Sequence, residues 1–141
     1  MALFDRMNQR AMIWVQDMMT ELRTVDADKA FHALRAGLQA LRDRLSVEEA
    51  AQLAAQLPLI IRGVFFEGWD PTGKPTRVRH AEDFLALVRN NYEPRTDLAA
   101  DDVVVALFRV LSRHVSEGEL TDVMMSLPRE IVAVALPRVE H

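Results

Sequence analysis

The sequence of 141 residues contains no cysteine, and only 6% of its residues are aromatic. The absence of cysteine excludes a disulfide scaffold, thiolate zinc sites and a cysteine nucleophile, and it suits a reducing cytoplasm. Few aromatic residues beside abundant Ala, Leu, Val and Met favour helices over strands. A chain of this length buries roughly 68–70% of the surface that its unfolded form exposes, so it can build one core without disulfides or metals. We therefore expect a single all-helical domain over residues 1–141.

The sequence also lacks a long apolar run and an excess of positive charge. Its most apolar stretch, 57–66, contains Arg62 and is too short for a membrane core of about 30 Å. Asp5 and Arg6 interrupt the N-terminal residues, unlike the apolar core of a signal peptide. Residues 1–70 carry 8 Lys and Arg against 10 Asp and Glu, and residues 71–141 carry 9 against 11. We therefore predict a cytoplasmic protein with no membrane span and no nucleic-acid partner.

Two parts of the sequence are similar at an offset of 70 residues. Between 34–65 and 104–135, eight of 32 positions are identical, among them Ser46 with Ser116 and Leu57-Pro58 with Leu127-Pro128. Similarity at a fixed offset indicates a repeated structural unit. We predict a first copy over about 4–66, a linker over 67–79 and a second copy over about 80–137. The two copies pack into one helical bundle, related either by a pseudo-twofold axis or by a translation.

Apolar periodicity and capping residues predict four helices in each copy. The expected helices are 4–22, 27–45, 47–56 and 58–66, followed by 80–91, 98–115, 117–126 and 128–136. The first carries an apolar stripe, as does the second, where small residues beside the stripe permit close packing. Ser46 with Glu49, and Ser116 with Glu119, predict capping boxes in which the serine accepts an amide proton and the glutamate reaches back. The two stripes consist of Phe4, Met7, Ala11, Trp14, Met18 and Leu22, and of Phe31, Leu34, Leu38, Leu41 and Leu45.

Several strings of residues resemble the bacterial family known as domain of unknown function 2267 (DUF2267). They are 41–58, 66–71 with 73–75, and 111–119 with Leu127-Pro128. The resemblance covers roughly 10–137, which is nearly the whole chain. It implies a helical bacterial protein, and the family carries no established activity, substrate or catalytic residue to transfer. The function therefore has to be sought in the residues themselves.

The linker 67–79 occurs once and has no counterpart in the repeat. Asp70-Pro71-Thr72-Gly73 fits a type I turn, and long loops in compact domains are often functional. The candidate ligand-binding residues are Trp69, Asp70, Lys74, Arg77 and Arg79. Trp69 offers a stacking surface, and the three cations, near the start of the next helix, suit a carboxylate or phosphate. The alternative is an ordered strap between the copies, in which Trp69 fills the core and the cations are solvated.

No other motif assigns a chemistry to this sequence. His80, Glu82 and Asp83 cluster at a helix start, but their spacing matches no metal motif, and acidic residues are expected there from the helix dipole. No nucleotide-binding loop or hydrolase motif occurs. We assign no catalytic residue, metal or cofactor, and predict a non-enzymatic interaction or scaffold module with an unknown protein partner or self-association. The alternative is a small-anion or small-molecule binder using the linker, and a weaker one is a hydrolase or metal-dependent enzyme.

Overall fold

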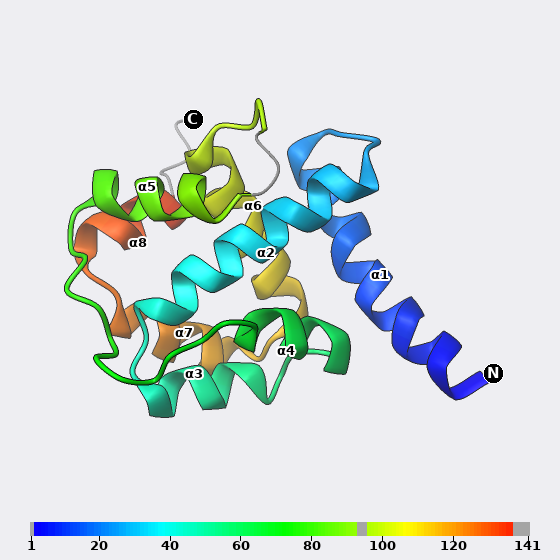
Figure 1. Ribbon diagram of the computed structural model, residues 1–141, viewed down its shortest axis with the longest axis horizontal. Coiled ribbons are helices and arrows are strands. Elements are labelled where there is room, and N and C mark those ends of the chain that lie inside the picture. Colours follow the sequence, from blue (N-terminus) through cyan, green and yellow to red (C-terminus); the bar gives the residue numbers. More distant parts are fainter. Residues whose placement is uncertain (1, 93–95, 137–141) are drawn as a thin grey trace.

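The computed structural model describes residues 2–92 and 96–136, so the predicted end of the second copy at residue 137 lies outside it. Over these ranges the chain forms eight helices and no strand, which confirms the all-helical prediction (Figure 1). The helices are α1 (Ala2–Leu22), α2 (Ala27–Asp43), α3 (Val47–Ala54), α4 (Leu59–Phe66), α5 (Ala81–Asn91), α6 (Ala100–His114), α7 (Glu117–Ser126) and α8 (Arg129–Ala135).

The predicted helix bounds lie within two residues of the observed ones, because local chemistry sets most of them. Ser46 and Ser116 cap α3 and α7, each hydroxyl accepting the amide proton three residues on at 3.1 Å. The second half of the capping box is different from the prediction at Ser116. Its backbone N–H is donated to Gln56 Oε1 at 2.6 Å, which leaves the carboxyl of Glu119 free to face another helix.

The core is built around α2 and α6, the two helices with the longest runs of buried residues. They pack against each other, and α1 and α5 each contact both of them. Gly37 permits a close approach of α2 to α6, because a Cβ atom at this position would lie 3.1 Å from Leu107 Cδ2. The small residues that flank the apolar stripe of α2 are buried as expected, with Ala30, Ala33 and Ala40 fully covered.

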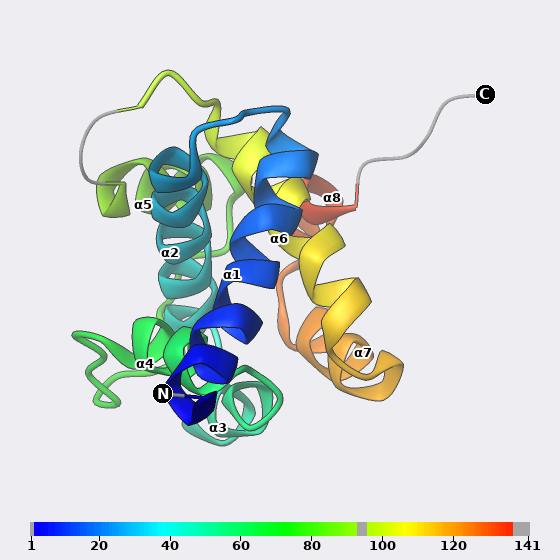
Figure 2. The ribbon, with the colours of Figure 1, turned by 90° about the vertical axis from the view of Figure 1, so that its right-hand side faces the viewer.

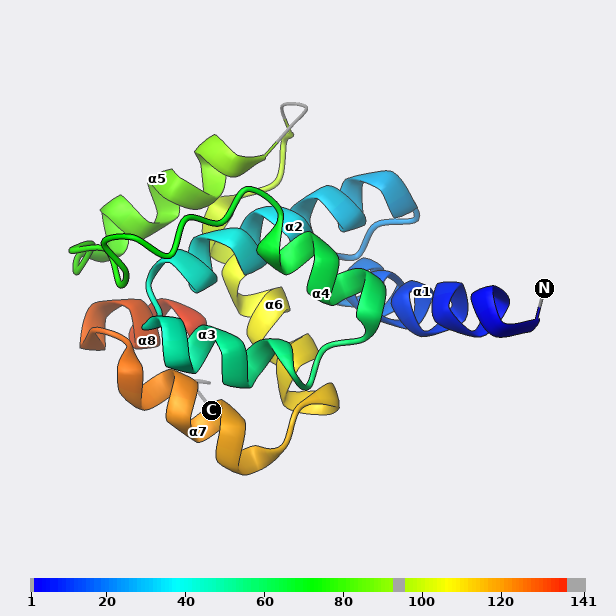
Figure 3. The same ribbon diagram turned by 60° about the horizontal axis from the view of Figure 1, so that its bottom comes forward.

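The helix contacts of the first half recur in the second half with the partners exchanged. Between the halves, α1 packs on α6 while α5 packs on α2, and this is the exchange. Within each half the contacts simply repeat, since α4 packs on α1 and α2 as α8 packs on α5 and α6. In addition α3 lies against α7, which Figure 3 shows side by side. A pseudo-twofold axis produces such an exchange, and a translation does not. The two-copy organisation itself stays a prediction.

The first turns of α1 project away from the rest of the molecule (Figures 1 and 3), while its later turns lie between α2 and α6 (Figure 2). The predicted stripe is therefore buried only in part. Trp14 and Met18 are covered, whereas the side chain of Phe4 is 53% exposed. Helical periodicity identified the face correctly, but it carried no information on where the neighbouring helices end.

Candidate functional site

The linker 67–79 is held to the side of α2 by polar side chains of that helix. Arg42 Nη1 donates to the carbonyl oxygens of Phe65 at 2.8 Å and Glu67 at 2.5 Å. Gln39 Nε2 donates to the carbonyl of Val64 at 3.1 Å. Both side chains are buried, so they satisfy the last carbonyl groups of α4 where few waters reach. The path of the chain out of α4 is thus fixed by α2.

Further along, the linker is bonded to the carboxyl end of α2. The backbone N–H of Thr76 donates to the carbonyl of Asp43 at 2.9 Å, and Arg44 Nη1 donates to the carbonyl of Thr76. Near the start of the linker, Arg35 Nε and Nη2 both donate to Glu67 Oε1, at 3.2 and 2.9 Å. These contacts support the ordered-strap interpretation of the linker.

Trp69 packs against α4. Its ring lies 5.1 Å from that of Phe66, its side chain is half-buried against the core, and its Nε1 is buried without a hydrogen-bond partner among the described residues. Asp70 stabilises its own turn by accepting the N–H of Thr72 at 2.9 Å, and that bond holds the pKa of the carboxyl below its ordinary value. Trp69 and Asp70 thus have local structural roles.

The three cations of the linker, Lys74, Arg77 and Arg79, lie in the second half of the strap. Arg77 and Arg79 are exposed, and neither forms an ion pair within residues 2–92 and 96–136, while Lys74 is half-buried. Burial, together with the nearby charge of Arg79, lowers the pKa of Arg44. Both Arg44 Nε and Thr76 Oγ1 are buried without a partner in the described part of the chain. The structure therefore places Arg79 near Arg44, a residue that the sequence did not single out.

His80 is bonded to Glu130 of α8. Its Nδ1 lies 2.9 Å from Glu130 Oε2 of α8, and the other oxygen of Glu130 accepts the N–H of Ala81 at 3.2 Å. Glu130 thereby caps the start of α5. Within the described ranges no three His, Asp or Glu residues come together as metal ligands, so Glu82 and Asp83 remain first-turn residues of α5.

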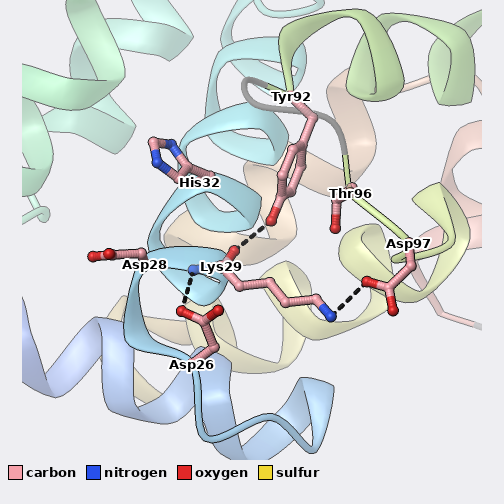
Figure 4. A pocket seen from close by; sticks show the side chains of 7 residues that line it. All are labelled: Asp26, Asp28, Lys29, His32, Tyr92, Thr96 and Asp97. Atoms are coloured by element: carbon pink, nitrogen blue, oxygen red, sulfur yellow. Dashed lines mark hydrogen bonds and ion pairs between the residues drawn. The ribbon is translucent and has the colours of Figure 1, made fainter.

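A cavity of about 310 Å³ lies between the start of α2 and the chain after α5 (Figure 4). Tyr92 Oη donates to the carbonyl of Lys29 at 2.6 Å, and Lys29 Nζ reaches Asp97 Oδ1 at 2.5 Å. Asp26 accepts the N–H of Lys29 at 3.1 Å. The hydrogen bond with Asp97 raises the pKa of Lys29, and the same bond lowers that of Asp97.

The groups around this cavity are mostly engaged with each other. Asp26 caps α2 and Asp97 neutralises Lys29, whereas in Figure 4 the carboxylate of Asp28 points away from Lys29 and Asp97. The imidazole of His32, 6.3 Å from the ring of Tyr92, keeps a buried Nδ1 without a partner in the described chain. Among the described residues that line this cavity, no hydroxyl group is hydrogen-bonded to a histidine or a carboxylate.

A second, smaller cavity of about 230 Å³ lies at the root of the projecting part of α1. Arg10, Ile13 and Trp14 of α1 line it, opposite Gln56, Pro58 and His114. The indole of Trp14 stacks on His114 at a centroid distance of 4.8 Å, and His114 Nε2 lies 2.6 Å from Asp17 Oδ2. Beyond this cavity, α4 begins with two exposed apolar residues, Leu59 and Ile60.

Comparison with protein families places the chain among known sequences. The model of a family described as an uncharacterized conserved protein, DUF2267, matches residues 11–134. The chain belongs to the DUF2267 family. A comparison with curated proteins found no match.

The extent of the DUF2267 match separates α1 into two parts. The match begins at residue 11, where the buried part of α1 begins with Ala11, and it leaves out the projecting residues 2–10. α5 begins at Ala81, whose counterpart at the offset of 70 is Ala11, so residues 4–10 of the predicted first copy have no helical counterpart among the described residues. Residues 2–10 thus lie outside the part of the chain that the family model matches.

Sequence reasoning missed three residues of this DUF2267 protein that position the linker, Gln39, Arg42 and Arg44. All three are buried polar side chains of α2 or, for Arg44, of the residue that caps its carboxyl end, with exposed fractions of 6–8%. The only signal for them is that they lie beside a strongly apolar stripe on a helix that must also contact the linker. Long polar side chains are usually exposed, so their burial could not be inferred without knowing the path of 64–76.

In the described residues no helix is both long and apolar enough to span a membrane.

Proposed function

We propose that this DUF2267 protein is a non-enzymatic interaction module that binds a protein partner through an apolar surface on α1 and α4. The observation that carries the proposal is the projecting end of α1. The surface, called the projecting surface below, consists of Leu3 and Phe4 of α1 and Leu59 and Ile60 of α4, with exposed fractions between 38% and 57%. Exposed apolar groups gathered on one side of a protein are typical of binding sites for other proteins.

The energetics of the projecting segment support a missing partner. An isolated helix shorter than about 12–15 residues is only marginally stable in water, and helices in proteins gain most of their stability by packing an apolar face. Residues 2–10 continue α1 with Phe4 and the half-buried Met7 on the stripe of Trp14, beyond the neighbouring helices. A partner that covers this stripe would supply the packing that the rest of the chain does not.

The charges beside the stripe favour an acidic partner segment. Arg6 and Arg10 are exposed, and neither forms an ion pair within the described part of the chain. We infer a partner helix whose apolar face covers Phe4 and Leu59 and whose flanking carboxylates meet the two arginines. The cavity of about 230 Å³ beside Arg10 is smaller than ordinary small-molecule sites of roughly 300–1,000 Å³, so it suits a single side chain of that helix.

The proposal is tested by photo-crosslinking in the native host. A photoreactive phenylalanine analogue is placed at Phe4, and as a control at Val25, an apolar residue that is 97% exposed outside the projecting surface. We expect one discrete protein adduct from position 4 and none from position 25. Light scattering of the purified protein decides whether the partner is a second copy. Equal adducts from both positions, or none from position 4, would contradict the proposal.

A second candidate function is the binding of a small anion by the linker, for which Arg44 supplies a specific observation. A buried donor without an acceptor is costly, and two neighbouring guanidinium groups repel each other. Arg44, at the end of α2, lies beside the part of the strap that carries Thr76 and the exposed Arg79. An oxyanion bound there would accept hydrogen bonds from all three groups and offset the repulsion.

Thermal denaturation with inorganic phosphate or sulfate tests the second candidate at constant ionic strength, set with chloride. We expect phosphate to raise the melting temperature of the wild type but not of a variant carrying Arg79→Gln, nor of one with Trp69, Lys74, Arg77 and Arg79 replaced by Ala. Arg89→Gln, on α5, is the matched control for a lost surface charge. The candidate is excluded if the phosphate effect persists in the linker variants.

A further inference from the structure

Two glutamates at equivalent positions of the predicted repeat meet where α3 packs against α7. Glu49 is the third residue of α3 and Glu119 the third of α7, at the offset of 70. Their carboxyl groups are within hydrogen-bonding reach of each other. Glu119 is only 7% exposed and Glu49 is half-buried, and the Oε1 atom of each is buried without a partner in the described chain.

This arrangement requires a proton. A carboxylate can only accept hydrogen bonds, so two ionised carboxylates in contact repel each other and form no bond. If one of them is protonated, its hydroxyl donates to the other, and the contact becomes attractive. Burial, followed by the hydrogen bond and charge of Glu49 and the charge of Asp122, raises the pKa of Glu119 to about 7.

The surroundings of the pair add negative charge and no described cation. On α7 the nearby group is Asp122, and on α3 the adjacent Glu48 is exposed. The basic groups of the helices next to them are engaged elsewhere. Arg62 of α4 donates to carbonyl groups of 54–57, whereas Arg113 and His114 of α6 bind Glu21 and Asp17 of α1. A proton is therefore the available means of relieving the repulsion.

We propose that the contact between α3 and α7 is a pH-dependent latch, in which one proton held between Glu49 and Glu119 keeps the two helices together and its loss loosens them. Because α3 belongs to the first half of the chain and α7 to the second, the latch controls how firmly the two halves are held together at this contact. The two hydrogen bonds between Gln56 and Ser116, at the same contact, would remain after the proton leaves. The two halves would therefore stay in contact there.

The sign of the pH effect follows from the raised pKa of Glu119. Between the ordinary value of 4.5 and the folded-state value of about 7, the folded protein holds a proton that the unfolded chain has lost. Stability from this group is therefore complete below pH 4.5, falls as the pH rises, and is gone above about 7. Asp97 and Glu130 behave in the opposite way, because their hydrogen bonds to Lys29 and His80 lower the pKa of each carboxyl group.

The test compares the wild type with Glu119→Gln, which cannot ionise and can still donate a hydrogen bond to Glu49. Between pH 5.5 and 8, we expect the unfolding constant of the wild type to rise roughly 30-fold more than that of the variant. Glu48→Gln is the matched control, since it removes an exposed carboxylate from the same turn of α3, and it should follow the wild type. Histidines contribute equally to the unfolding constants of the wild type and both variants. Comparing each variant with the wild type therefore cancels their contribution.

A second measurement keeps the test decisive if Glu119→Gln folds poorly. Carbon NMR of the wild-type carboxyl groups should give Glu119 a titration midpoint near neutral pH, and Glu49→Gln should move it downward. Amide hydrogen exchange in 117–126 should accelerate above neutral pH after correction for intrinsic rates. A midpoint of Glu119 near 4.5, or exchange in α7 that does not depend on protonation, would overturn the proposal.

Discussion

Gln56, in the turn after α3, holds Ser116 at the start of α7 through two hydrogen bonds. Its Oε1 accepts the backbone N–H of Ser116 at 2.6 Å, and its Nε2 donates to Ser116 Oγ at 3.1 Å. The same hydroxyl accepts the N–H of Glu119, so Ser116 is the cap of α7 and the acceptor of a side chain 60 residues earlier. A single amide side chain thus connects a helix cap in one half of the protein to a turn in the other.

Replacing Gln56 with Ala should destabilise the protein by about 1 kcal/mol. The variant removes two hydrogen bonds and leaves one N–H at the start of α7 to water. The expected loss equals the usual cost of removing a helix cap. Urea denaturation measures the change in the free energy of unfolding. Gln52→Ala, an exposed change on α3, is the control and should alter it by less than about 0.5 kcal/mol. Equal effects of the two changes would count against a specific role of Gln56.

Two glycines of helices should respond to substitution with opposite signs. At Gly37, a larger side chain meets Leu107 of α6, so Gly37→Leu should lower the free energy of unfolding by about 1–3 kcal/mol through overpacking. At Gly63, nothing lies within 4 Å of an added Cβ, so Gly63→Ala should raise it by about 0.5–1 kcal/mol through better helix propensity. Thermal and urea denaturation of both variants provide the comparison. A stabilising Gly37→Leu would show that α2 and α6 are less tightly packed than described.

The sequence predicted the helices well because their signals are local. Ser46, Ser116 and the proline residues at 58 and 128 act within one helical turn, and they placed the short helices within two residues. The prolines precede α4 and α8 as extended capping residues, rather than opening them as predicted, since their ψ angles are 152° and 148°. Local chemistry thus located the start of each short helix to within two residues. It did not show that the proline itself lies just outside the helix.

The candidate sites were harder to predict, because they depend on contacts between distant segments. Glu49 and Glu119 were expected to complete their own helix caps, and the structure brings them together across two helices instead. Similarly, Arg44 could be assigned to the strap only once the linker was seen to return along α2. The projecting end of α1 depends on the point at which α4 stops covering it. Apolar periodicity alone could not give that point.

Arg42 should be the residue on which the linker most depends. Arg42→Leu keeps an apolar stem but removes the donors to the carbonyls of Phe65 and Glu67, and it should lower the free energy of unfolding by about 2–4 kcal/mol because these bonds involve a buried charge. Trypsin should then cleave faster after Arg77. Arg35→Ala is the control, since its pair with Glu67 is exposed and worth at most about 1 kcal/mol. Unchanged cleavage in the Arg42 variant would mean that the other bonds of the strap suffice.

His80 and Glu130 should titrate as a linked pair that joins α5 to α8. The hydrogen bond that the imidazole donates to Glu130 raises the pKa of His80 above its ordinary 6.5, and the same bond holds the pKa of Glu130 below 4.5. The stabilisation from His80 is therefore fully present below pH 6.5 and is lost as the pH rises through the raised value, whereas that from Glu130 is lost in acid. Proton NMR of the imidazole gives the midpoint directly. Glu130→Gln should lower it towards 6.5, while Glu82→Gln, in the same first turn, should move it much less. If neither change shifts the midpoint, the contact between His80 and Glu130 is not formed in solution.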